Sequence, residues 1–264
     1  MVVAVLVALS VVAVVALTAW RMLSRPHVPQ DDVRVLAIVT TVQDDGSRAA
    51  DLIAYARIVA GKDAVDVVLV PSTLRVRVAG VSDDRLREIY SYGGAAEVRQ
   101  VFAEHLGVPV DVAVAIDEPQ LVSLLGGASS VRVRLARTVD LFRRDRYESF
   151  PEGTDLSLTP TDTVDLLAAS ALSEPPGEDM TMQAALVSAA LPVVAPRLAG
   201  SRAPAEVDVS GDGRTIRRMQ SLLAQAGWPN MALEIAPGRR SVVGERVYFD
   251  PEVAYWESRF RRSP

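Results

Sequence analysis

The side chains of this sequence that can do chemistry are carboxylates, arginines, hydroxyls and amides. Cysteine is absent and the histidines are His27 and His105, which excludes disulfides, thiolate metal sites, a histidine-rich zinc site and a histidine-dependent catalytic triad. A cation, if the protein uses one, must therefore take oxygen ligands. The 28 basic and 33 acidic residues give a net charge of −5, which argues against nucleic acid as a partner.

Apolar β-branched runs alternate with helical patterns after residue 32, and these elements must position the polar side chains. Two predicted helices meet at Gly93 and Gly94, and the second of them ends at Gly107. Strands are predicted over residues 33–40, 52–60, 64–70, 110–116, 131–135, 231–235 and 246–249. Further helices are predicted over residues 119–125, 160–172, 180–191 and 214–226. This order predicts a layered α/β/α domain with a mixed central sheet.

The first 20 residues form an apolar segment with no charged side chain over residues 2–20. A helix of this length spans about 28 Å at 1.5 Å per residue, which matches one bilayer core. We predict a transmembrane anchor within residues 1–25, a linker over 26–32 and the main domain over 33–200. Residues 201–264 are predicted to form a C-terminal extension, either part of the same domain or a small α/β subdomain.

Three segments in order resemble motifs of the LytR-CpsA-Psr family of envelope proteins. They are RLREIYSYGG at residues 85–94, GVPVDVAVAID at 107–117 and LVSLLGGA at 121–128. The resemblance extends over residues 33–200 and includes a single membrane helix before the domain. It implies an extracytoplasmic body, whereas Arg21 and Arg25 after the anchor place the body in the cytoplasm by the positive-inside rule. The sequence leaves the orientation open between these two.

The resemblance implies a phosphotransferase that moves a glycan from a polyprenyl diphosphate carrier to the cell wall. In that family arginines cradle the diphosphate, an aspartate helps to hold Mg²⁺ and an apolar pocket takes the lipid tail. Carried over by position, Asp51 is the catalytic and metal-binding aspartate and Arg85 the second catalytic residue. Gln183 keeps its family position as a substrate-binding residue. Arg48, Arg75 and Arg87 are the further predicted substrate-binding residues, as relocated arginines that rebuild a basic site around Asp51.

Each of these assignments has a plain structural alternative. Asp51 is equally a polar residue at a strand start, and arginines are most often solvated surface residues. Arg75 and Arg77 alternate along one strand and so favour one polar strand face. Gln183 is equally a buried amide.

Several arginine and aspartate positions of the family pattern carry small or neutral residues here. These substitutions are Ala49, Ser72, Thr73, Ser123, Ala168, Ser170 and Met182. Because each lost guanidinium contact removes charge stabilisation, the pattern predicts transfer activity that is weakened or lost.

Three functions follow from these observations. The first is a membrane-anchored protein of cell-wall glycopolymer assembly that binds a polyprenyl phosphate or diphosphate without efficient transfer. The second is an active phosphotransferase with relocated arginines and Mg²⁺, and the third is a non-catalytic scaffold that docks other envelope proteins. We expect convergence of the arginines on Asp51 to separate the first two.

Overall fold

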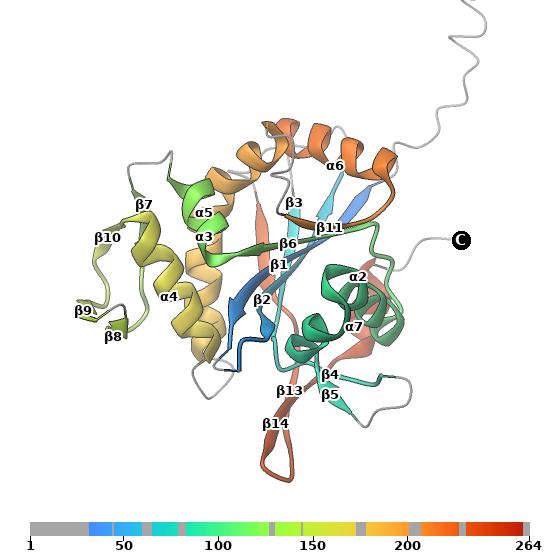
Figure 1. Ribbon diagram of the computed structural model, residues 1–264, viewed down its shortest axis with the longest axis horizontal. Coiled ribbons are helices and arrows are strands. Elements are labelled where there is room, and N and C mark those ends of the chain that lie inside the picture. Colours follow the sequence, from blue (N-terminus) through green and yellow to red (C-terminus); the bar gives the residue numbers. More distant parts are fainter. Residues whose placement is uncertain are drawn as a thin grey trace, which may run out of the picture. The chain divides into compact units, whose positions relative to one another are not determined.

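The computed structural model describes residues 32–43, 45–59, 65–78, 83–126, 130–143, 145–172, 178–200, 207–226 and 231–260. The predicted anchor and its linker up to residue 31 lie outside the described residues. The unit that begins at Val33 contains a six-stranded mixed sheet with helices on both faces (Figure 1). The predicted layered α/β/α class is therefore confirmed.

The central sheet has the strand order β11-β6-β1-β2-β3-β12. Its centre is an antiparallel meander of β1, β2 and β3, while β6 pairs parallel with β1 and β12 parallel with β3. The edge strand β11 runs antiparallel to β6. The strands are β1 (Val33–Val42), β2 (Arg48–Ile58), β3 (Val65–Val70), β6 (Val112–Asp117), β11 (Asp208–Ser210) and β12 (Ala232–Ile235).

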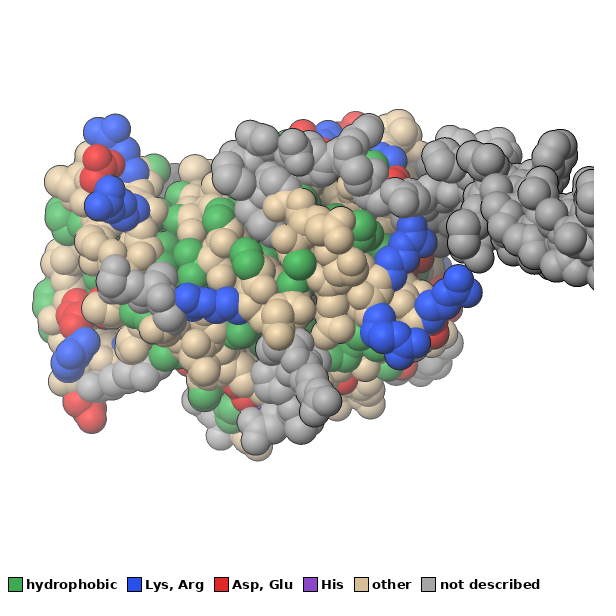
Figure 2. Space-filling model, turned by 90° about the horizontal axis from the view of Figure 1, so that it is seen from above, with side chains coloured by type: hydrophobic (Ala, Val, Ile, Leu, Met, Phe, Trp, Pro, Cys, Tyr) green, Lys and Arg blue, Asp and Glu red, His purple; other side chains and the backbone are tan. Residues whose placement is uncertain are grey.

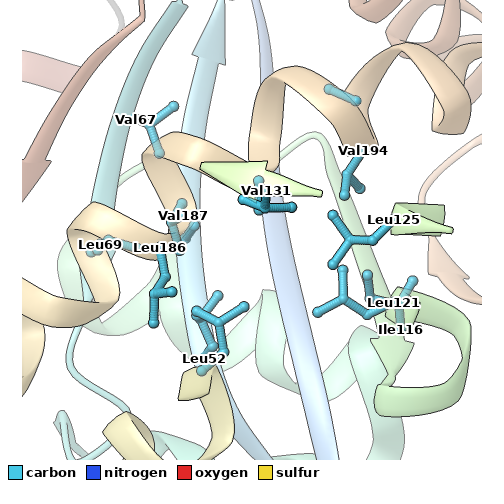
Figure 3. Close-up of a cluster of buried hydrophobic side chains, with 14 of the residues drawn as sticks. Leu52, Val67, Leu69, Ile116, Leu121, Leu125, Val131, Leu186, Val187 and Val194 are labelled. Carbon is cyan, nitrogen blue, oxygen red and sulfur yellow. The ribbon is translucent and has the colours of Figure 1, made fainter. Parts of the chain in front are cut away.

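The two faces of this sheet carry separate cores because alternate strand residues point to opposite sides. One face packs against α3 (Glu118–Leu125), α4 (Pro160–Leu172), α5 (Glu178–Gly200) and α6 (Gly213–Gln225). The other packs against α2 (Leu86–Leu106) and α7 (Val253–Phe260). Figure 3 shows the first core, where Leu52 and Val67 of the sheet face Leu186 and Val187 of α5.

Four two-stranded ribbons lie outside the central sheet, and most of their strands were missed by the sequence pattern. The outermost positions of one ribbon explain why, since Phe142 and Tyr147 are cross-strand partners and are 71% and 69% exposed. Large apolar residues that point to solvent give no inward-facing alternation to detect. The ribbons are β4 (Arg75–Val76) with β5 (Asp84–Arg85), β7 (Val131–Arg134) with β10 (Asp155–Leu158), β8 (Val139–Arg143) with β9 (Arg146–Phe150), and β13 (Gly238–Val243) with β14 (Arg246–Pro251).

The break predicted at Gly93 and Gly94 is a kink within α2. Gly94 has φ +64°, a conformation that side chains disfavour, and an added Cβ would lie 2.6 Å from Asp208 Oδ2. That carboxylate accepts hydrogen bonds from Ala95 N at 2.7 Å and from the Tyr90 hydroxyl at 3.1 Å. Asp208 thus caps the second half of α2 from the edge strand β11.

Helix α5 corrects a predicted boundary, because the sequence predicts an end at residue 191 and the helix continues to Gly200 through Pro192 and Pro196. Buried Val194 and Ala195 keep the later turns packed despite the missing amide donors. By length and composition, Met180–Gly200 is the one helix of the described residues that could cross a membrane. One face of this helix is buried in the first core, and packing there explains its apolar composition as well as a membrane would.

The C-terminal segment supplies part of the central architecture. Strands β11 and β12 are the two edge strands of the six-stranded sheet. Helix α7 places Trp256 against Tyr55 and Phe102, with ring centroids 5.8 and 5.6 Å apart. These contacts join the chain after residue 201 to the body of the fold.

Candidate functional site

A β-bulge places Asp51 at the end of the central sheet. Val39 pairs with Leu52 and Thr40 pairs with Ala50, so Asp51 has no partner in β1. An extra residue of this kind re-aims its side chain. The Asp51 side chain is 2% exposed and lies at the edge where β1 and β6 end.

Both carboxylate oxygens of Asp51 have neighbours of opposite polarity. The Thr41 hydroxyl donates a hydrogen bond to Asp51 Oδ2. The side-chain amide of Gln43 donates a hydrogen bond to the Thr41 hydroxyl at 2.8 Å. The Nη2 atom of Arg87 lies 2.6 Å from Oδ1, and Arg87 is 89% buried (11% exposed). The guanidinium hydrogens are not aligned on Oδ1, so this contact is an ion pair without a hydrogen bond. Asp51 and Arg87 therefore form a buried charge pair.

Burial raises the pKa of Asp51 above its ordinary value, because desolvation disfavours the carboxylate. The Thr41 hydrogen bond and the Arg87 charge act in the opposite direction but do not cancel the desolvation. Glu88 and Glu118 add to the upward shift through their negative charge. Several carboxylates therefore crowd around one buried guanidinium.

Two further predicted arginines lie near this pair, each bound to its own carboxylate. Arg85 is in contact with Glu88, which also lies 4.0 Å from Arg87 Nε. Arg48, half-exposed, lies 3.4 Å from Asp117 at the end of β6. These arginines are internally neutralised, unlike the free guanidinium groups that a diphosphate needs.

The other two predicted residues lie elsewhere in the fold. Arg75 of β4 contacts Asp83 and lies 3.8 Å from Asp250 of β14. Gln183 is buried on α5. Of the four predicted arginines, Arg87 alone contacts Asp51.

Sequence reasoning missed the polar residues that complete the cluster. Glu118 is the first residue of α3 and lies beside Asp51. Arg143 of β8 forms one ion pair with Glu118 and another with Asp165 of α4, each at 3.0 Å. Thr41 was likewise missed, although polar residues at the carboxyl end of a buried strand are a usable signal. Arg143 carried no comparable signal in the sequence, because the β8–β9 ribbon that positions it was not predicted.

An apolar cavity of about 120 Å³ lies between the sheet and helices α5 and α6. Alanine at positions 37, 54 and 56 of the strands and at 190 and 195 of α5 explains the space, since larger residues there would fill it. Figure 2 shows the α5–α6 side, with green hydrophobic side chains near its middle and charged groups toward both ends. Gln220 is the only polar residue among the described residues that line the cavity.

The apolar cavity and the Asp51 cluster share a wall. A smaller void beside Asp51, Thr41 and Glu118 is lined by four residues that also line the large cavity. These shared residues are Val39, Leu52, Leu121 and Leu167. The combined region therefore has a charged end and an apolar body, which suits an amphipathic ligand.

The residues at this site do not fit Mg²⁺. One oxygen of Asp51 accepts from Thr41 and the other faces a cationic guanidinium. Glu88 and Glu118 are themselves paired with Arg85 and Arg143. No group of three acidic or histidine side chains able to hold a metal occurs in the part of the chain that the structure describes. Mg²⁺ needs several free oxygen ligands, which this arrangement does not offer.

Solved structures show which fold this is. TagV of B. subtilis superimposes with a TM-score of 0.69 over 87% of this chain and 94% of its own, at 15% identity. TagT of B. subtilis gives 0.61 over 88% and 89%, at 12% identity, and Lin1025 of Listeria innocua gives 0.60 over 89% and 100%, at 16% identity. The chain has the LytR-CpsA-Psr fold. Neither family sequence models nor curated protein sequences match it.

The LytR-CpsA-Psr fold explains the three motifs. Residues 85–94 enter α2 and form its kink, residues 107–117 contain the helix-ending glycine and β6, and residues 121–126 belong to α3 and its cap. One further similar structure is TagT bound to LIIa-WTA, with a TM-score of 0.63 and 12% identity. At these identities the likeness establishes the architecture.

Proposed function

We propose that this chain is a membrane-anchored, extracytoplasmic LytR-CpsA-Psr-like protein of cell-wall glycopolymer assembly that binds a polyprenyl phosphate or diphosphate. The observation that carries the proposal is the shared wall between the apolar cavity and the charged Asp51–Arg87 cluster. The cavity of about 120 Å³ would admit a short apolar part of the polyprenyl chain, and the Arg87 guanidinium is the group of this cluster that would attract the phosphate. The similar TagT structure with LIIa-WTA supports a glycopolymer role.

The ion pairs support weakened transfer activity. Arg48, Arg85 and Arg87 each lie against a carboxylate of the protein itself. In a transfer reaction these guanidinium groups would neutralise the developing negative charge of the diphosphate, and the internal carboxylates compete for them. We therefore expect slow transfer, while the apolar cavity still offers a place for the lipid chain.

Native mass spectrometry of the detergent-extracted full-length protein tests the lipid. We expect a bound polyprenyl phosphate or diphosphate on the wild type and its loss in Ala190→Leu, because leucine fills the cavity lining. Ser188→Leu is the matched control, since Ser188 is exposed on the same helix. A clean apo mass for the wild type, or equal lipid on wild type and Ala190→Leu, would contradict lipid binding and favour the scaffold function.

The extracytoplasmic position has its own test. Protease added to intact spheroplasts should digest the body if residues 2–20 anchor it on the outer side. A protected body that becomes digestible only after lysis would place it in the cytoplasm and remove the cell-wall role.

An active phosphotransferase is the second candidate because Arg87 contacts Asp51. Arg85 is linked to Arg87 through Glu88, which contacts Arg85 and lies 4.0 Å from Arg87 Nε. It would transfer a glycan from a polyprenyl diphosphate carrier to a cell-wall acceptor. Transfer by the wild type that is abolished in both Asp51→Ala and Arg85→Ala would establish it over the binding protein.

A further inference from the structure

Arg87 lies against the Asp51 oxygen that accepts no hydrogen bond. Its Nη2 atom is 2.6 Å from Asp51 Oδ1, and the two side chains are 11% and 2% exposed. A divalent cation bound to the same oxygen would lie within a few ångströms of the guanidinium, and two positive charges at that separation repel in a desolvated site. The buried pair therefore excludes a metal as long as Arg87 is present.

Neighbouring carboxylates add to the negative charge that the Arg87 guanidinium compensates. Glu88 and Glu118 both act on Asp51 through their negative charge, and Glu88 Oε1 also lies 4.0 Å from Arg87 Nε. Removing the guanidinium would free Asp51 Oδ1 and end the Arg87 contact of Glu88, and both are carboxylate oxygens of the kind that Mg²⁺ binds. The cation of this cluster is thus supplied by the chain itself.

Two buried donors of this cluster lack a hydrogen-bond acceptor. The Nε atoms of Arg85 and Arg87 are buried and have no hydrogen-bond partner. A buried donor without an acceptor is costly, and a phosphate oxygen would satisfy it. Charge-assisted bonds of this type are strong without a metal.

We propose that Arg87 replaces a divalent cation beside Asp51, so that this site holds the phosphate end of its lipid without Mg²⁺. The phosphate part rests on the proposed function, whereas the replacement of the metal does not. The two parts are tested separately, first with the metal alone and then with a soluble polyprenyl diphosphate.

The metal test follows the unfolding temperature of the full-length protein in magnesium chloride against potassium chloride of equal ionic strength. We expect no specific shift for the wild type, and a rise of about 2–4 °C for Arg87→Gln at magnesium concentrations a few-fold above its Kd. Arg77→Gln is the matched control for loss of one charge, because Arg77 is 82% exposed and pairs with Asp83 instead. A magnesium-specific rise in the wild type, or none in a folded Arg87→Gln, would overturn the replacement.

The phosphate test measures binding of farnesyl diphosphate to the wild type in EDTA and in magnesium chloride, and needs no variant. We expect equal affinity in both buffers. Affinity that drops at least about tenfold in EDTA would overturn the metal-free site while leaving the proposed lipid binding intact. No binding in either buffer would instead overturn the proposed function itself, and with it the phosphate part of the inference.

Discussion

The two faces of the central sheet are built from the same strands but differ in how completely their side chains fill the space against the helices. Toward α2 and α7, β2 presents Ile53 and Tyr55, and the space is filled by aromatic rings. Toward α5 and α6 the same strand presents Ala54 and Ala56, and a cavity of about 120 Å³ remains. The face toward α2 and α7, here the filled face, therefore holds the fold together by close packing. The face toward α5 and α6, here the hollow face, leaves the apolar cavity that we propose as the lipid site.

The largest expected effect is on the filled face. Trp256→Ala should lower the free energy of unfolding by about 3–5 kcal/mol, because Trp256 is fully buried against several rings. Leu223→Ala on the hollow face should cost about 2 kcal/mol, the low end for such a change, since Leu223 already borders a void. Urea unfolding of both variants measures the contrast, and equal losses would remove the distinction between the faces.

A matched pair of alanines on β2 sharpens the comparison. Ala50 is buried toward the filled face, so Ala50→Leu should overpack it and cost about 1–3 kcal/mol. Ala54→Leu should cost less than about 1 kcal/mol because its added atoms enter the cavity. Thermal unfolding of the two variants decides the point, and a larger loss for Ala54→Leu would mean that the cavity does not accept added volume.

The smallest effect concerns the charge at the margin of the hollow face. The pKa of Asp51 is raised above 3.8, so the folded state binds this proton more tightly than the unfolded state. The stability of the wild type relative to Asp51→Asn should therefore fall as the pH rises from about 3.8 through the raised folded pKa, and then level off. Urea unfolding over a pH series measures this difference, and a rise with pH would show that Arg87 outweighs the desolvation.

Much of the framework could be predicted from the sequence. The strand β1, the break at Gly93 and Gly94 and the helix-ending Gly107 each rest on a local signal of β-branching or glycine conformation. The ordered motifs carried the fold even though neither sequence comparison finds a match.

The site was less predictable because its geometry is not local. The bulge that leaves Asp51 unpaired depends on the register of β1 and β2, and the ion pair with Arg87 joins residues 36 positions apart. Arg143 reaches Glu118 from a ribbon with exposed aromatic residues, which has no inward-facing pattern. Arg75, predicted in the site, is instead held by Asp83 across a ribbon that the pattern does not show.

Hydrogen exchange of the full-length protein with and without farnesyl diphosphate tests whether the hollow face binds the lipid. We expect slower amide exchange in α5 and α6 on addition of the diphosphate, with α2 and α7 unchanged. Slower exchange confined to α2 and α7, or no change in any helix at saturating ligand, would contradict it.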